Sequence, residues 1–139
     1  MKTASWLDSS ALLTLLQDEP GTDTVTALLE AAEKGSATLL LSTVSLTEIV
    51  SVLARTFGEK AARDDLRLIR EMPIDIRSPT QDDCIAAGWL RTQFKLSTAD
   101  AITAAQARAA GAELVHKDPA LEAVPELKQR KLPHIPTKG

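Results

Sequence analysis

Short apolar runs alternate with longer helical stretches along the whole chain, and this alternation limits the fold more than any other feature. The expected strands are Ser5–Leu7, Thr38–Leu41, Ile74–Ile76 and Ala112–Val115. The expected helices are Ala11–Leu16, Thr22–Lys34, a helix that ends near Thr56 after an N-cap at Ser42, Thr43 or Ser45, Glu59–Glu71, Thr80–Phe94 and Thr98–Ala110. Apolar strands joined by helices are typical of parallel sheets covered on both faces. The sequence therefore predicts an α/β fold with a short, mainly parallel central sheet.

Glycine and proline mark the ends of these elements, as at Gly35, Pro73 and Gly111. The chain has 139 residues, which suits one domain with a core of ordinary size. It contains no internal repeat, low-complexity tract or linker, so we expect residues 1–139 to form a single domain. A further edge strand is expected at Leu132–Ile135.

The composition excludes several kinds of site. Aromatic residues make up only 3% of the chain, so a surface that stacks the bases of single-stranded nucleic acid is not expected. Cys84 is the only cysteine, which excludes an intrachain disulfide and a thiolate metal cluster. Its place in an Ala-rich helical stretch predicts a buried thiol. Met1–Leu7 lacks the apolar run of a signal peptide, and no stretch is long enough to span a membrane, so we expect a cytoplasmic protein.

Several carboxylates follow the expected strands. Asp8 comes directly after the first strand, Glu48 lies in the helix after the second, and Asp118 follows the fourth. The loops at the carboxyl ends of parallel strands share one edge of the sheet, so these three side chains should lie near one another. Asp100 lies in the first turn of a helix that follows another helix, and periodicity alone does not place it at that edge.

Each of these carboxylates also has a structural explanation. Asp8 could favour the start of a helix, although Ser9 and Ser10 can cap it as well; Ser45 to Glu48 matches a capping box. Asp100 suits a first helical turn, and Asp118 before a proline suits an N-cap. Carboxylates gathered at one edge would nevertheless repel one another, and Lys117 is the only base nearby in sequence. A hard cation such as Mg²⁺ or Mn²⁺ would resolve this conflict and could activate water for phosphodiester cleavage.

Four segments, in this order, resemble the motifs of the PIN-domain family, and in particular VapC-type toxins of toxin–antitoxin pairs. They are Trp6–Leu13 followed by Glu19-Pro20-Gly21, Ser45–Leu53, Leu96–Ala101 and Glu113–Asp118. The resemblance implies an α/β/α sandwich, a Mg²⁺- or Mn²⁺-dependent endoribonuclease, a homodimer, and inhibition by a small antitoxin protein whose tail enters an acidic groove. The family's acidic positions, which would bind the metal and orient the attacking water on RNA, fall on Asp8, Glu48, Asp100 and Asp118.

Two positions depart from the family pattern. His116 stands where Ser or Thr is common. It could bind the metal itself, but we expect it rather to act near the metal indirectly or to be solvated. Leu121 stands where Phe is frequent, which we interpret as a packing difference. The net charge of −3 does not favour a nucleic-acid binder unless cations neutralise the carboxylates. The spacing of Arg63, Arg67 and Arg70, with acidic residues nearby, favours an ordinary solvated helix face over a phosphate track.

Two other kinds of α/β protein also carry acidic residues at the carboxyl edge of a parallel sheet, and the sequence fits both less well. A phosphoacceptor receiver module would have adjacent acidic residues after its first strand, where this chain has Asp8 followed by Ser9. A haloacid-dehalogenase-type phosphatase would have a second Asp at the position of Ser10. Asp82 and Asp83 are interpreted as first-turn helix residues rather than site residues. The alternative that stays open is a PIN-like module without catalysis that acts through protein or RNA partners.

Overall fold

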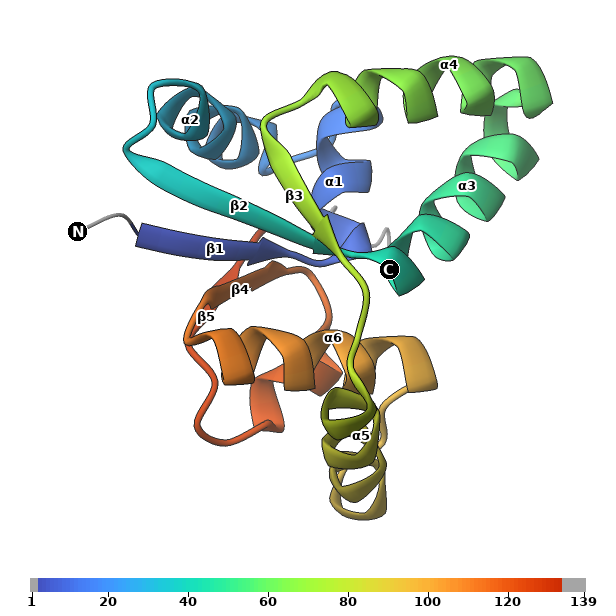
Figure 1. Cartoon of the computed structure of the whole chain (residues 1–139). Coiled ribbons are helices and arrows are strands. Elements are labelled where there is room, and N and C mark those ends of the chain that lie inside the picture. The colour runs from blue at the N-terminus through green and yellow to red at the C-terminus, as the bar shows by residue number, and fades with distance from the viewer. Residues whose placement is uncertain (1–2, 134–139) are drawn as a thin grey trace.

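The computed structural model describes residues 3–133, which form a parallel sheet with helices on both faces (Figure 1). The sheet has five strands in the order β3-β2-β1-β4-β5, and every neighbouring pair is parallel. The strands are β1 (Thr3–Leu7), β2 (Ala37–Ser42), β3 (Ile74–Arg77), β4 (Glu113–His116) and β5 (Gln129–Lys131). The helices are α1 (Ser9–Leu16), α2 (Thr22–Glu33), α3 (Thr43–Phe57), α4 (Glu59–Glu71), α5 (Gln81–Gln93), α6 (Thr98–Ala110) and the 3₁₀ helix η1 (Pro119–Ala123). The predicted α/β fold class is confirmed.

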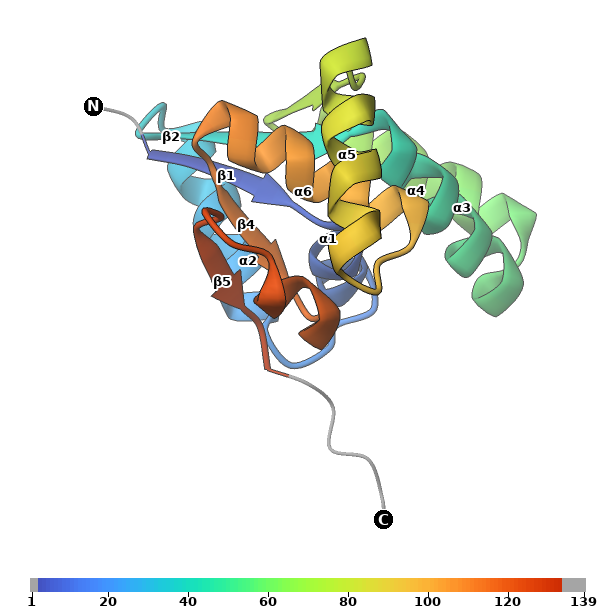
Figure 2. The same cartoon turned by 90° about the horizontal axis from the view of Figure 1, so that it is seen from below.

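Alternation along the strands divides the core into two halves. Trp6 and Leu114 face one side of the sheet, where they pack with α5, α6 and η1. The neighbouring residues Leu7 and Val115 face the other side, where α1 to α4 pack. Figures 1 and 2 show these two helical layers with the sheet between them. The sheet thus forms the middle of three layers, as side-chain alternation in strands buried on both faces requires.

Strong helix signals predicted the helix limits well, while the last strand was misplaced. The limits of α4 and α6 agree with the prediction, and Ser42 is the N-cap of α3. The edge strand lies at Gln129–Lys131 and not at Leu132–Ile135, of which residues 134 and 135 fall outside the described part. β5 is a polar strand at the sheet edge, so hydrophobicity could not reveal it, whereas the apolar Leu132 is buried in the core.

The expectation of a buried thiol at Cys84 is wrong, because this side chain is exposed. The helix α5 packs mainly on α6, and its buried residues are Ala87 and Leu90. Its first turn is stabilised instead by a capping box between Thr80 and Asp83, as expected of a first-turn acidic residue. In the described part of the chain, no helix combines the length and the apolar character that a membrane span needs.

Candidate functional site

A pocket of about 290 Å³ opens at the carboxyl ends of β1 and β4, and all four carboxylates singled out in the sequence line it. They are Asp8, Glu48, Asp100 and Asp118. Parallel β1, β2 and β4 direct the residues after them to the same edge, which explains three of the four. The fourth arrives because α6 begins at this edge, which sequence periodicity alone did not show.

Asp8 is nearly fully buried and is the N-cap of α1. Its Oδ2 accepts hydrogen bonds from Ser10, at 2.6 Å from Oγ and 3.3 Å from the backbone nitrogen. Burial raises the pKa of Asp8, and the negative charge of Glu48 raises it further, against the lowering effect of the Ser10 hydrogen bonds. The carboxylate is therefore fixed in place but unfavourable in its charged form.

Glu48 lies in the second turn of α3, and its Oε2 accepts a hydrogen bond from the Ser9 hydroxyl. The expected capping box at Ser45 is wrong, because the helix begins earlier, with the Ser42 hydroxyl accepting from the Val44 backbone nitrogen at 3.3 Å. Glu48 is therefore too far along the helix to cap its start. Its side chain instead joins α3 to α1 across the pocket.

Asp100 and Asp118 lie at two further helix starts. The Asp100 backbone nitrogen donates to Ser97 Oγ at 3.1 Å, so Ser97 caps α6 and the Asp100 carboxylate does not. Burial, then the charge of Asp8, then a hydrogen bond and charge from Asp118 raise the pKa of Asp100 to about 7. Asp118 Oδ1 accepts from the Ala120 backbone nitrogen at 2.9 Å, which confirms the predicted N-cap, although the helix is 3₁₀.

Lys117 is the only cationic side chain among the described residues that line this pocket. Its Nζ lies 3.8 Å from Glu19 Oε1, so part of its charge is directed away from the four carboxylates. Burial is the largest cause of the raised pKa values of Asp8 and Asp100, and the negative charges of neighbouring pocket carboxylates raise both pKa values further. One lysine does not balance four carboxylates in the pocket.

The carboxylate oxygens of the pocket are the type of ligand that a hard divalent cation such as Mg²⁺ prefers. Within residues 3–133, no three Asp, Glu, His or Cys side chains converge closely enough, as they lie, to hold an ion by themselves. Mg²⁺ commonly keeps several waters and binds through only one or two carboxylates, so a closed cage is not required. Binding of such a cation would also offset the repulsion between the carboxylates, which adds to burial in raising the pKa of Asp8 and Asp100.

Three polar residues around the pocket were not recognised as part of it from sequence. Ser9 and Ser10 had been interpreted only as helix caps, but their hydroxyls hold Glu48 and Asp8. Gln129 was overlooked because it lies in the short polar strand β5, and it contacts the ring of His116. His116 is fully buried, so a solvated role is excluded.

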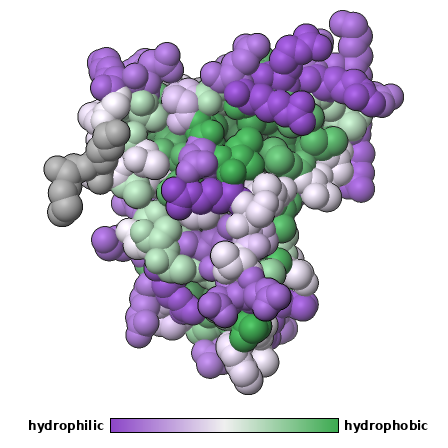
Figure 3. All heavy atoms as spheres, in the orientation of Figure 1, coloured by the Kyte–Doolittle hydropathy of each residue, from purple (hydrophilic) through white to green (hydrophobic). Residues whose placement is uncertain are grey.

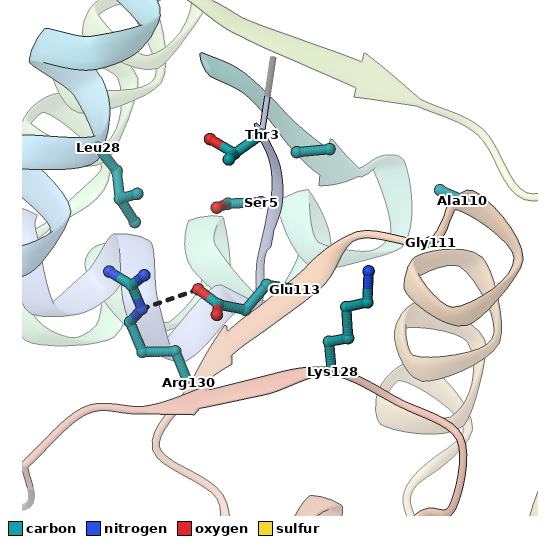
Figure 4. Close-up of a pocket in the computed structure, with 9 residues that line it drawn as sticks. Thr3, Ser5, Leu28, Ala110, Gly111, Glu113, Lys128 and Arg130 are labelled. Carbon is teal, nitrogen blue, oxygen red and sulfur yellow. Dashed lines mark ion pairs between the residues drawn. The ribbon is translucent and has the colours of Figure 1, made fainter. Parts of the chain in front are cut away.

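Other surface features lie away from the carboxylates. A larger hollow of about 520 Å³ is found at the amino ends of the strands, where Arg130 and Glu113 form an ion pair of 2.8 Å (Figure 4). On α4, Arg63 pairs with Glu59 at 2.8 Å, and Figure 3 shows hydrophilic side chains concentrated over this helix. This ion pair is consistent with the ordinary solvated face expected for the α4 arginines.

The chain is similar to known proteins in both sequence family and fold. The family model of the PIN domain matches residues 6–127. A search of curated protein sequences found no match. Among solved structures, the chain is similar to VapBC2 from Rickettsia felis bound to a DNA fragment from its promoter, with 18% identity and a TM-score of 0.78, covering 94% of this chain and 100% of that one.

Two further structures have the same fold. VapBC-1 from nontypeable Haemophilus influenzae is 16% identical with a TM-score of 0.72, covering 93% of this chain and 98% of that one. VapC20 from Mycobacterium tuberculosis, described as a toxin that cleaves the sarcin-ricin loop, is 19% identical with a TM-score of 0.68, covering 86% of this chain and 93% of that one. At these identities the likeness concerns the fold.

Proposed function

The chain belongs to the PIN-domain family, and we propose that it is a Mg²⁺- or Mn²⁺-dependent endoribonuclease, the toxin of a toxin–antitoxin pair. The observation that carries this proposal is the pocket in which Asp8, Glu48, Asp100 and Asp118 come together from four separate segments. The description of VapC20 as a toxin that cleaves the sarcin-ricin loop supports the reaction class. The substrate is an RNA phosphodiester bond and the products arise by hydrolysis.

One or two of the four carboxylates would hold the cation directly, and the others would hold it through its bound waters. When bound, such a cation supplies an activated water and stabilises the leaving oxygen of a phosphodiester. The chain's own residues prepare this site: Ser9 turns Glu48 toward the pocket, and Ser10 fixes Asp8. Because burial and mutual repulsion favour protonated carboxyls at Asp8 and Asp100, these two residues would release protons if a cation bound.

The proposed partners are a cognate antitoxin protein and a second copy of the chain, in the cytoplasm. Several similar structures are VapBC assemblies, some of them bound to DNA, which supports an antitoxin partner. Size-exclusion chromatography with light scattering on the purified protein tests the homodimer. A mass of one chain at micromolar concentration would contradict it.

Cleavage of RNA by matched variants tests the reaction. Asp8→Asn and Asp100→Asn should abolish Mn²⁺-dependent cleavage of a long in vitro transcript, while circular dichroism shows an intact fold. Asp82→Asn is the control, since Asp82 is an exposed acidic residue in the first turn of α5. Cleavage by both pocket variants at the rate of the unchanged protein would overturn the proposal. If the pocket variants are inactive as expected, sequencing the ends of RNA that is cut after expression of the unchanged protein would identify the substrate.

Thermal melting with and without Mn²⁺ gives an independent answer. A cation that binds the native state must raise the melting temperature of the unchanged protein. Asp100→Asn should show a smaller rise. No rise at millimolar Mn²⁺, together with no cleavage, would favour a binding module without catalysis.

A further inference from the structure

His116 lies fully buried at the end of β4, two residues before Asp118. Its Nδ1 is 3.1 Å from the backbone nitrogen of Asp118, and its Nε2 is 2.8 Å from Oε1 of Gln129. A backbone N–H can only donate, so Nδ1 must be the accepting nitrogen. The ring proton therefore lies on Nε2 and is donated to Gln129.

Gln129 continues this hydrogen-bond chain to the far end of η1. Its Nε2 donates to the carbonyl oxygens of Leu121 at 3.0 Å and Val124 at 3.4 Å. These two acceptors fix the orientation of the carboxamide, because only its nitrogen can donate to them. One side chain of β5 thus holds both the His116 ring and the end of the helix that Asp118 caps.

The short connection between β4 and η1 is held at two consecutive backbone N–H groups. Lys117 donates to Ser10 Oγ at 3.1 Å, and Asp118 donates to the His116 ring. Ser10 in turn donates to Asp8 at 2.6 Å, so one anchor of this connection is shared with a pocket carboxylate. The direction of the Asp118 side chain depends on the backbone that these contacts fix.

We propose that His116 and Gln129 form a positioning pair that sets the Asp118 carboxylate toward the other three pocket carboxylates. The proposal rests on the proposed function, because it concerns how the cation site is kept in shape. A Ser or Thr at position 116 could accept the Asp118 N–H but is too short to reach Gln129 as well. In this chain, the position of Asp118 therefore depends on the edge strand β5.

Two substitutions of His116 separate positioning from general packing. H116N keeps an oxygen near Nδ1 and so keeps an acceptor for Asp118, while H116Q keeps a donor near Nε2 for Gln129 and loses that acceptor. Each variant loses one buried hydrogen bond, so their losses of stability should be similar. Positioning predicts a difference between them: H116Q should bind Mn²⁺ about tenfold more weakly than H116N.

Hydrogen exchange of the Asp118 amide, followed by NMR in EDTA, tests the same point without a cation. The amide should exchange about tenfold faster in H116Q than in H116N or the unchanged protein. Equal exchange and equal Mn²⁺ affinity in H116N and H116Q would overturn the proposal. If the unchanged protein neither binds Mn²⁺ nor cleaves RNA, the proposed function fails, while the exchange data still decide whether the pair positions Asp118.

Q129M tests the link to β5 at a partly exposed position, where the fold tolerates substitution more readily. The Met side chain keeps the volume and removes the three hydrogen bonds of Gln129 to His116, Leu121 and Val124. We expect faster exchange at Asp118 and weaker Mn²⁺ binding at the same far-ultraviolet circular dichroism. Unchanged exchange and affinity in Q129M would refute the contribution of the strand.

Discussion

Asp100→Asn should make the cation-free protein more stable near pH 8, although it removes a side chain proposed to bind metal. The pKa of Asp100 is raised from 3.8 to about 7, first by burial, then by the charge of Asp8 and by Asp118. The unfolded chain lacks these neighbours, so above pH 7 the native carboxylate is ionised in surroundings that disfavour its charge. Asn has nearly the same shape and carries no charge, which removes the unfavourable contribution.

The direction and size follow from proton binding. Between pH 3.8 and about 7 the native protein keeps a proton on Asp100 that the unfolded chain releases, so stability falls as pH rises through this window. A pKa change of this size corresponds to about 4 kcal/mol, at about 1.4 kcal/mol per unit. Because Asp100 is partly exposed, solvent screening reduces the expected gain in the free energy of unfolding to about 1–3 kcal/mol. The gain should be larger at about pH 8 than at about pH 5.

Urea unfolding in EDTA at these two pH values measures the effect. Asp82→Asn serves as the charge-matched control and should show no such gain, because Asp82 is exposed. Saturating Mn²⁺ should reverse the order, since the cation stabilises the unchanged protein more than the variant. An Asp100→Asn variant that is no more stable at pH 8, or that gains equally at pH 5, would refute the electrostatic reasoning.

Three further outcomes are expected. Mn²⁺ affinity should fall by about tenfold from pH 8 to pH 6, because protons compete with the cation for a carboxyl such as Asp100, whose pKa is about 7. Titration calorimetry measures this affinity, and an affinity that does not change with pH would contradict the prediction. Gly21→Ala should destabilise by about 1–2 kcal/mol in urea, because Gly21 has φ +106° and a new Cβ would lie 3.2 Å from Leu132 Cβ. Ile49→Ala, at a fully buried site, should cost about 2–5 kcal/mol, and a loss below 1 kcal/mol would show that the core there repacks.

Local signals in the sequence determined most of the fold. Gly58 and Gly111 border α4 and α6, and these helices begin and end where capping and glycine chemistry predict. The sequence did not predict β5, because this segment is a strand through its pairing with β4 and not through its own composition. Propensity and periodicity describe a segment by itself, whereas an edge strand is defined by its neighbour.

The candidate site, too, could be predicted from the sequence only in part. The positions of Asp8 and Asp118 after parallel strands were predictable, because topology alone brings strand ends together. The hydrogen bond from Ser9 to Glu48 joins residues 39 positions apart, and the one from His116 to Gln129 spans 13. No rule of spacing indicates which polar residue of a remote segment supplies such a partner. The contacts that position the carboxylates therefore required the structure.

Capping and a role in the pocket are compatible explanations for these carboxylates. In a parallel sheet, each crossover helix begins near the carboxyl edge, so a residue that caps its first turn is already at the rim of the crevice. Asp8 and Asp118 cap helices with one carboxylate oxygen each, and both still line the pocket. Capping cannot explain Glu48, which lies in the second turn of α3, nor the raised pKa of Asp100. Glu48 and Asp100 therefore distinguish this pocket, in which several carboxylates lie together, from a set of ordinary helix N-termini.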